Sequence, residues 1–249
     1  MNRYLESLRK IEFVVTERCT GRCRHCSAGG DRKNGCSIDP TVAVNAVRAV
    51  AALYPIETVM AFGGEPLLRP ETTVAIMRAA SDAGVRHRQV ITNGFFTKNR
   101  QRAERVAAAL ADAGVNDLLL SVDAFHEETI PLASVYDFAG AVISFGIPVR
   151  LSPAWLVGRE ADNPYNCKTR AIIDAMSSLG IEPGQGHVIF PEGNALIHLK
   201  EYFTDKISEN PYIDDPKNIT CFSVSANGDV LGSNLYREDP IKILQGYRP

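Results

Sequence analysis

Residues 11–26 read IEFVVTERCTGRCRHC, an apolar run followed almost at once by three cysteines. The run at 11–16 is rich in β-branched residues, and its length is typical of a buried strand. The cysteines follow with the spacing Cys19-x3-Cys23-x2-Cys26. Three thiolates on one short loop can reach a single metal centre. The sequence therefore predicts a buried strand that leads into a metal-binding loop.

The identity of the metal centre stays open on spacing alone. Six cysteines in 249 residues are too few for a disulfide scaffold, and a tight cluster favours metal or redox chemistry. Structural zinc needs four ligands, and the fourth could come from His25, Cys36 or a distant cysteine. Three cysteines with an empty fourth position suit a [4Fe–4S] cluster whose unique iron accepts another ligand.

Strand-like and helix-like segments alternate beyond the first strand. Short β-rich runs are predicted at 11–16, 56–62, 89–92, 117–122, 147–152 and 187–190, with helical patterns at 39–53, 70–83, 98–113, 135–145 and 169–179. Six strands that alternate with five helices predict an α/β fold with a parallel sheet and right-handed crossovers. Their number and spacing favour a partial (β/α)6 TIM-like barrel with a small C-terminal appendage. A doubly wound sheet is the alternative.

Motifs rich in glycine and polar residues follow the predicted strands at their C-terminal ends. In chain order these motifs lie at 19–26, 63–66, 92–94 and 121–123. In a parallel sheet these ends meet on one rim, where such folds place their ligands and catalytic groups. The sequence therefore predicts one functional site built from four motifs.

The alternation changes after about residue 190. The remaining chain carries two short strand-like runs, at 220–225 and 229–232, with a turn signal at Asn227-Gly228 between them. We expect a core at 1–190 and a C-terminal extension at 191–249.

Composition limits the classes of partner. The formal net charge is −2 and the sequence pI is about 6.2, with both signs mixed along the chain. This balance offers no electrostatic footprint for nucleic acid or for an anionic membrane. The N-terminus has no apolar signal region, and no apolar stretch approaches the roughly 20 residues of a membrane span. The sequence predicts a cytoplasmic protein.

The CxxxCxxC loop after the first strand and the Gly63-Gly64-Glu65-Pro66 turn after the second together resemble the signature of the radical S-adenosylmethionine (radical SAM) superfamily. The resemblance covers about the first 190 residues. It implies that the three cysteines at 19, 23 and 26 hold one [4Fe–4S] cluster. It also implies that the open iron binds the amino and carboxylate groups of SAM.

The resemblance implies roles for the first two motifs. His25 occupies the position before the third cysteine where the family often has an aromatic residue near the adenine. Gly63 and Gly64 would let the backbone approach the methionyl ammonium group. Glu65 would accept from that ammonium or lie near it, and Pro66 completes the motif.

The later strand ends carry further implied contacts. Thr92 and Asn93 match a strand-end motif that lines the SAM pocket in relatives. Ser121 and Asp123 match positions that often meet the ribose hydroxyls or the carboxylate, and Ser152 on the fifth predicted strand is a weaker match. Plain turn or cap chemistry is the alternative for all of them.

The C-terminal extension resembles a degenerate SPASM or twitch domain, which in relatives holds extra iron–sulfur clusters. The run Gly228-Asp229-Val230 is not followed here by the further cysteine found in those relatives. Cys36, Cys167 and Cys221 alone cannot complete a four-cysteine cluster, so we expect no auxiliary cluster. Cys167 or Cys221 could instead return a hydrogen atom to a substrate radical, although burial as a small apolar residue is the ordinary fate of a free cysteine.

The implied reaction is reductive cleavage of SAM to methionine and a 5′-deoxyadenosyl radical, which removes a hydrogen atom from the substrate. A ribosomal peptide or natural-product intermediate is the favoured substrate, with epimerisation, a cross-link or oxidation as outcome. A small sugar- or amino-acid-like metabolite is the alternative. A non-catalytic zinc or iron–sulfur electron-transfer protein is the alternative from another class.

Two expectations concern partners. The cluster needs an electron at low potential, which implies a flavodoxin or ferredoxin. Only about ten residues precede the first predicted strand, so we expect no N-terminal leader-binding domain. Peptide recognition would then fall to the barrel mouth, the tail or a separate protein.

Scattered histidines, among them His126, His187 and His198, are available for proton transfer, although a lone histidine is more often structural.

Overall fold

A seven-stranded parallel sheet forms the centre of the protein, in the order β7-β5-β4-β3-β2-β1-β9. The computed structural model describes residues 2–30, 33–203 and 210–249. The strands of this sheet are β1 (Lys10–Thr16), β2 (Thr58–Gly63), β3 (His87–Thr92), β4 (Asp117–Leu120), β5 (Val149–Leu151), β7 (Glu182–Pro183) and β9 (Cys221–Val224). The strands follow one another in chain order from β1 to β5, which is the order of a barrel wall.

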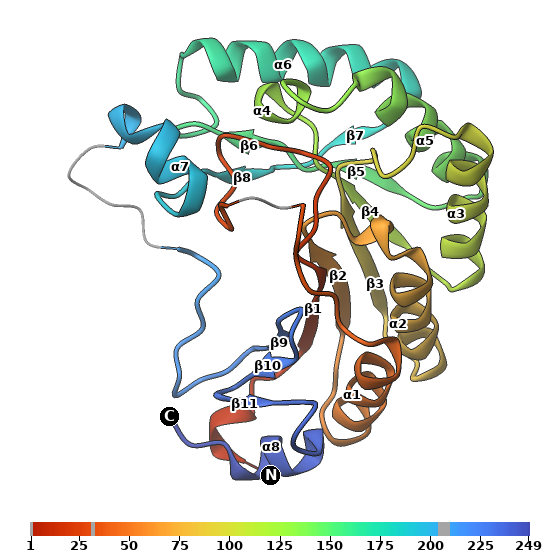
Figure 1. Cartoon of the computed structure of the whole chain (residues 1–249), viewed down its shortest axis with the longest axis vertical. Helices are drawn as coiled ribbons and strands as arrows, with labels where there is room; N and C mark the ends of the chain where they lie inside the picture. Colours follow the sequence, from red (N-terminus) through yellow and green to blue (C-terminus); the bar gives the residue numbers. More distant parts are fainter. Residues whose placement is uncertain (1, 31–32, 204–209) are drawn as a thin grey trace.

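The long helices lie on one side of the curved sheet, its convex outer face (Figure 1). They are α1 (Pro40–Leu53), α2 (Pro70–Asp82), α3 (Arg100–Asp112), α5 (Leu132–Ser144) and α6 (Pro164–Met176). A doubly wound sheet reverses its strand order and carries helices on both faces. The partial-barrel prediction is therefore confirmed, and the doubly wound alternative is wrong.

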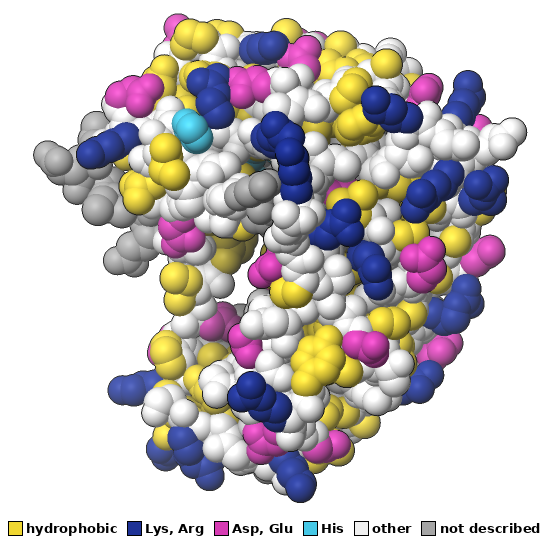
Figure 2. Space-filling view, in the orientation of Figure 1, with side chains coloured by type: hydrophobic (Ala, Val, Ile, Leu, Met, Phe, Trp, Pro, Cys, Tyr) yellow, Lys and Arg dark blue, Asp and Glu magenta, His cyan; other side chains and the backbone are white. Residues whose placement is uncertain are grey.

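Shorter elements complete the chain around this framework. They are η1 (Arg3–Leu5), η2 (Pro66–Leu68), α4 (Ala124–Glu127), β6 (Ala154–Trp155), η3 (Ser177–Leu179), β8 (His187–Val188), α7 (Gly193–His198), η4 (Lys200–Tyr202), β10 (Asp229–Val230), β11 (Ser233–Asn234) and α8 (Pro240–Gly246). No helix within the described ranges is long and apolar enough to cross a membrane. Acidic and basic side chains are interspersed over the face in Figure 2.

Local capping explains where the helices begin. The Asp39 side chain accepts from the N–H groups of Thr41 and Val42, and Pro40 occupies the first turn of α1. Asn163 and Pro164 open α6 in the same way, five residues before the predicted start at 169. The apolar periodicity began later than this cap, so the predicted helix started too late.

The core lies between the sheet and its helices. On β1 the alternate residues Ile11, Phe13 and Val15 are completely buried, and Val47 and Val50 of α1 belong to the same apolar cluster. Burial of side chains of this size contributes about 1.5–3 kcal/mol each to folding. The β-branched run at 11–16 thus forms a buried strand between β2 and β9.

The prediction of 187–190 as the sixth strand of the sheet is wrong. Glu182–Pro183 pairs with β5 in that place, whereas His187–Val188 pairs with Ala154–Trp155 in a separate two-stranded sheet. Gly186 between them has φ +68°, and a Cβ there would lie 2.1 Å from the carbonyl oxygen of Pro153. This glycine lets the chain turn away from the main sheet toward β6.

The segment predicted at 220–225 joins the main sheet. Its strand β9 pairs in parallel with β1, with Lys10 opposite Cys221 and Phe13 opposite Val224. Phe222 and Val224 are completely buried. The predicted turn follows, where Gly228 N–H donates to the Ser225 carbonyl, and β10 then pairs with β11. The division at 190 stays a prediction, and residues 204–209 of the extension lie outside the described part.

Phe222→Ala tests whether β9 is integral to the fold. We expect the free energy of unfolding to fall by about 3–5 kcal/mol, because the buried ring leaves a cavity against β1. Phe145→Ala is the matched control, since its ring is 46% exposed, and a change below about 1 kcal/mol is expected there. Chemical denaturation followed by circular dichroism measures both. Equal small losses would contradict the pairing of β9 with β1.

Candidate active site

A cavity of about 580 Å³ lies at the C-terminal ends of the strands. Its volume falls in the range of cofactor and ligand sites. Nine of the predicted residues line it: Cys19, Cys23, His25, Cys26, Gly63, Gly64, Thr92, Asn93 and Ser121. Glu65, Pro66, Asp123, Ser152, Cys167 and Cys221 are not among its lining residues. The structure thus brings the four strand-end motifs to one cavity, as the parallel topology predicts.

The cysteine loop is held by its own backbone and by α7. Cys26 N–H donates to the Cys23 carbonyl at 3.2 Å. Asn194 of α7 donates its N–H to the Cys26 carbonyl at 2.9 Å and its side-chain amide to the Cys23 carbonyl at 3.2 Å. Gly193 allows this approach, because a Cβ there would lie 2.3 Å from the Ser27 carbonyl oxygen. Asn194 is a site residue that sequence analysis missed.

The cysteine side chains suit a metal centre. Burial raises the pKa of Cys23, and the negative charges of Asp123, Cys19 and Cys26 raise it further. A buried thiolate beside other thiolates is stable only next to compensating positive charge, which bound metal supplies. Three sulfur ligands on one loop at the cavity wall therefore fit a [4Fe–4S] cluster.

The glycine turn after β2 packs against the entry of the cysteine loop. Gly64 N–H donates to the Thr16 carbonyl at 2.8 Å, and Glu65 N–H donates to the Arg18 carbonyl at 2.8 Å. A Cβ on Gly64 would lie 2.1 Å from the Arg18 oxygen. Gly63 has φ +128°, which favours glycine. Both glycines are therefore required by this backbone packing, and they also line the cavity.

The Glu65 carboxylate is completely buried beneath the cavity wall. One oxygen accepts from Leu67 N–H at 2.9 Å and from the Thr92 hydroxyl at 2.8 Å, and the other accepts from Asn93 N–H at 2.8 Å. Burial raises its pKa to about 7, although these three donors favour the charged form. Pro66 follows as the first residue of η2. Glu65 thus positions the end of β3 against the end of β2.

Asn93 connects β3 to the cysteine loop. Its side-chain amide donates to the Thr20 hydroxyl at 3.2 Å and contacts Cys19 Sγ at 3.6 Å, while its carbonyl oxygen accepts from Phe95 N–H at 2.8 Å. The Glu65 bond to the Asn93 backbone fixes the position from which this side chain reaches Cys19. The chain of contacts from Glu65 to Cys19 links the first three motifs.

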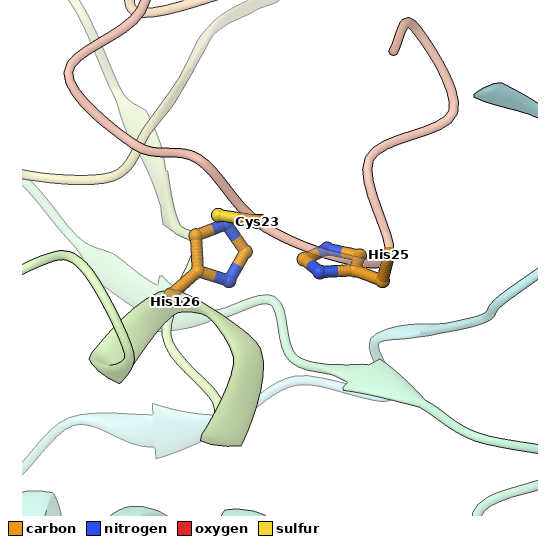
Figure 3. A group of neighbouring side chains, drawn as sticks. All are labelled: Cys23, His25 and His126. Atoms are coloured by element: carbon orange, nitrogen blue, oxygen red, sulfur yellow. The ribbon is translucent and has the colours of Figure 1, made fainter. Parts of the chain in front are cut away.

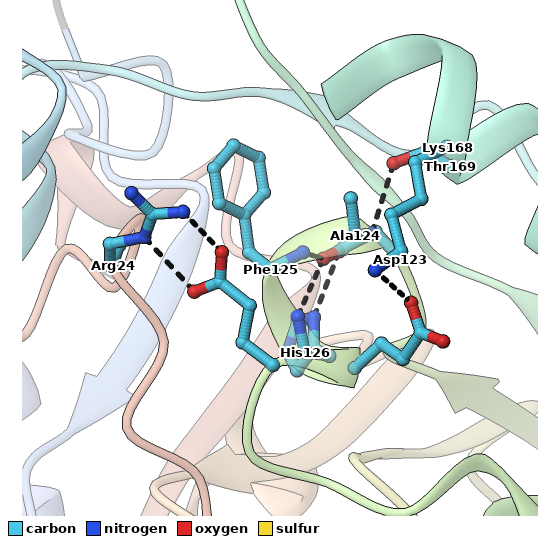
Figure 4. Close-up of polar contacts among 9 residues, drawn as sticks. Arg24, Asp123, Ala124, Phe125, His126, Lys168 and Thr169 are labelled. Carbon is cyan, nitrogen blue, oxygen red and sulfur yellow. Dashed lines mark hydrogen bonds and ion pairs between the residues drawn. The ribbon is translucent and has the colours of Figure 1, made fainter. Parts of the chain in front are cut away.

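Asp123 is a second buried carboxylate (Figure 4). One oxygen accepts from the N–H groups of Phe125 and His126, and the other accepts from Ala154 N–H at 2.9 Å and contacts His126 Nδ1 at 2.8 Å. Burial alone would raise its pKa, but the charge and hydrogen bond of His126 hold that pKa below its ordinary value. Asp123 caps α4 and orients His126.

The two predicted serines differ in placement. Ser121 lines the cavity, and its N–H donates to the Thr92 carbonyl at 2.8 Å. Ser152 continues the sheet pattern beyond β5, with its N–H bonded to the Leu120 carbonyl at 2.9 Å, and does not line the cavity.

Four of the five histidines line the same cavity: His25, His126, His187 and His198. The centroids of the His25 and His126 rings lie 4.9 Å apart with an interplanar angle of 64°, and the centroid of the His187 ring lies 6.3 Å from that of His25. Burial lowers the pKa of His25 to about 3, with His126 and His187 adding to the effect and Asp123 opposing it. Burial also lowers the pKa of His187. Sequence spacing gave no sign of this group, because the four lie on separate segments.

The other cysteines lie away from the cavity. Cys167 is exposed on α6, with its thiol 3.3 Å from an Asp162 oxygen, and Cys36 is also exposed. Cys221 is the first residue of β9 and pairs with Lys10, the first residue of β1. It therefore lies at the N-terminal end of the parallel strands, opposite the rim that carries the cavity. Burial raises its pKa, and Glu12 adds to the shift.

A partial α/β barrel whose rim joins a CxxxCxxC loop to a Gly-Gly-Glu-Pro turn has the architecture of a radical SAM enzyme. The chain belongs to the radical SAM superfamily, whose family model matches residues 13–143. The family's cofactors are SAM and a [4Fe–4S] cluster, and the three cysteines at 19, 23 and 26 carry its motif.

Individual relatives are more distant. GTP 3′,8-cyclase from Aquifex aeolicus (strain VF5) is 25% identical over 174 residues, which are 65% of this chain and 52% of that protein. The chain thus spans about half the length of this curated relative.

Solved structures of similar fold include two with bound SAM. Streptococcus suis SuiB bound to S-adenosylmethionine has a TM-score of 0.62 at 14% identity, covering 96% of this chain and 66% of that one. Native anSMEcpe with bound AdoMet has a TM-score of 0.59 at 13% identity, covering 93% of this chain and 76% of that one. These similarities establish the fold.

Glu65→Ala tests the buried carboxylate. The variant leaves three buried donors without an acceptor, so we expect the free energy of unfolding to fall by about 3–5 kcal/mol. Glu160→Ala is the control, since the Glu160 side chain is 92% exposed and its loss should change stability by less than about 0.5 kcal/mol. Denaturant titration of both proteins measures the difference. A Glu65 variant as stable as the control would contradict the proposed positioning role.

His25→Phe tests the burial of His25 through pH. The folded state holds the pKa of His25 near 3 against 6.5 for the free side chain. Below pH 6.5 the unfolded chain therefore binds a proton that the folded chain does not, and wild-type stability falls as pH falls. The difference in unfolding free energy between wild type and variant should change by up to about 3 kcal/mol between about pH 6.5 and about pH 4. If the unfolding free energies of the metal-free wild type and His25→Phe differed by the same amount at every pH, the lowered pKa of His25 would be contradicted.

Proposed function

We propose that this radical SAM enzyme holds one [4Fe–4S] cluster through Cys19, Cys23 and Cys26 and removes a hydrogen atom from a peptide or natural-product intermediate. The observation that carries the proposal is the single cavity that joins the three cysteines to Gly63 and Gly64 and to the ends of β3 and β4. A zinc or electron-transfer module has no need of this second set of residues.

The cofactor pair, when bound, supplies a 5′-deoxyadenosyl radical by one-electron cleavage of SAM. The chain's own residues bind the cofactors and orient the groups around them. The amide of Asn93 lies 3.6 Å from Cys19 Sγ, where it tunes a ligand sulfur. Gly63, Gly64 and Ser121 line the same wall of the cavity and are available to a polar ligand there. Glu65 and Asp123 act from beneath this wall as positioning residues.

Two features support a peptide substrate. A fold similar to this one is found in SuiB bound to its precursor peptide SuiA, with a TM-score of 0.59 at 14% identity. On α7, Asn194 and His198 line the cavity while Leu196 and Ile197 between them are 50% and 72% exposed. Leu196 and Ile197 do not line the cavity, but they are exposed apolar side chains on the same helix, which a peptide that leaves the cavity over α7 would contact. Epimerisation, cross-linking and oxidation all begin with the same hydrogen abstraction.

The placement of the remaining cysteines supports a single cluster. Cys36 follows the cysteine loop, Cys167 is exposed on α6 and Cys221 lies at the opposite end of the sheet. We further propose flavodoxin or ferredoxin as the electron donor, because the cluster requires one electron at low potential.

Alanine substitution of each loop cysteine tests the cluster assignment. Wild-type protein reconstituted anaerobically should hold about four irons and form 5′-deoxyadenosine from SAM and dithionite, in keeping with a [4Fe–4S] cluster. Cys19→Ala, Cys23→Ala and Cys26→Ala should each lose the cluster absorption and the nucleoside product. Iron analysis, visible spectra and chromatography of the nucleoside measure these outcomes.

Cys36→Ala is the matched control, because this exposed cysteine lies in the same loop region but does not line the cavity. It should retain both cluster and nucleoside formation. Wild-type protein that binds no iron, or a Cys26→Ala variant that still cleaves SAM, would overturn the proposal.

A further inference from the structure

Cys23, His25 and His126 form a second ligand group at the cavity wall (Figure 3). The Cys23 sulfur and one ring nitrogen of each histidine all lie within 4.8 Å of one another. Cys23 and His25 come from the cysteine loop, whereas His126 comes from α4 after the fourth strand. Tertiary folding alone brings these three side chains together.

His126 is oriented as a metal ligand is. Its Nδ1 contacts Asp123 Oδ2 at 2.8 Å (Figure 4). The Asp123 carboxylate is itself fixed by the N–H groups of Phe125 and Ala154. A metal-binding histidine commonly donates its other ring N–H to a carboxylate in this way. The bond assigns the proton to Nδ1 and leaves Nε2 with its lone pair.

His25 has an unsatisfied buried nitrogen. Its side chain is 8% exposed, and His25 Nδ1 has no hydrogen-bond partner. Buried polar atoms are nearly always paired, and an exception calls for an explanation such as an ion that is absent from the coordinates. The neighbouring rings of His126 and Phe125, with centroids 4.9 and 5.1 Å away, keep His25 in place beside Cys23.

We propose that the cluster-free protein binds one divalent transition-metal ion, with zinc as the cellular metal, at Cys23 Sγ, His25 and His126 Nε2. Cys23 binds as the thiolate, and its proton is released to solvent. Sulfur and imidazole ligands suit zinc and cobalt, and three protein ligands leave the fourth position open toward the cavity. In a tetrahedral zinc site neighbouring ligand atoms lie about 3.3–3.6 Å apart, so binding requires the side chains to approach by about 1 Å.

Zinc and the iron–sulfur cluster exclude one another in this arrangement, because Cys23 can serve only one of them. The mutual exclusion of zinc and cluster depends on the proposed role of Cys23 as a cluster ligand. Zinc binding itself does not depend on that role. Zinc occupancy would therefore hold the enzyme in a form that cannot accept its cluster until the ion is removed.

Cobalt(II) is the probe for this site. Untagged, metal-free protein is titrated anaerobically with Co²⁺, and the thiolate-to-cobalt charge-transfer band and the visible bands of a four-coordinate ion are recorded. Wild type and Cys26→Ala should both show these bands, although Cys26→Ala cannot hold the cluster. His126→Ala should bind Co²⁺ at least about tenfold more weakly and yet still assemble the cluster, which shows that it is folded. His25→Phe, which keeps the aromatic packing, should behave as His126→Ala does.

Zinc-loaded wild type should take up iron only after a chelator is added. A charge-transfer band that persists in His126→Ala and disappears in Cys26→Ala would place the ion on the three cysteines and overturn the inference. Normal cluster assembly without any Co²⁺ binding would overturn this inference and leave the proposed function intact. Simultaneous cluster assembly and zinc retention would overturn the exclusion.

Discussion

The buried Glu65 carboxylate is the interaction on which the site depends. It binds the N–H groups of Leu67 and Asn93 and the hydroxyl of Thr92, so the ends of β2 and β3 share one hydrogen-bonded centre. Asn93, placed in this way, contacts the cysteine loop at Cys19 and Thr20. A buried carboxylate that accepts three hydrogen bonds is held in place, because releasing any donor leaves a buried polar group unpaired.

Asp123 has the same positioning role on the other side of the cavity. It connects the end of β4 to α4 and to the start of β6, and it fixes the His126 ring. Both carboxylates therefore work by holding backbone and side chains in place. The cavity wall between them presents cysteine, glycine, serine and histidine, while the acidic groups stay beneath it. None of the described residues that line the cavity is acidic.

The same physical logic explains why the histidines matter as a group. A lone histidine is ordinary, yet His25 and His126 together place two ring nitrogens within 4.8 Å of the Cys23 sulfur. The cavity that carries the three motif cysteines thus also contains the elements of a mixed sulfur and nitrogen site. If Cys23 serves both the proposed cluster and the proposed zinc ion, the two compete for one buried thiol.

The sequence by itself determined the strand and helix alternation, the parallel sheet, and the cysteine loop and glycine turn on one rim. These follow from local periodicity and from the rule that parallel strands end together. Tertiary structure alone decided that β9 pairs with β1, that His187 leaves the main sheet, and that four histidines share the cavity. It also decided that Glu65 and Asp123 lie beneath the wall and that Cys221 lies at the far end of the sheet. Such facts depend on contacts between residues far apart in the chain, which spacing does not encode.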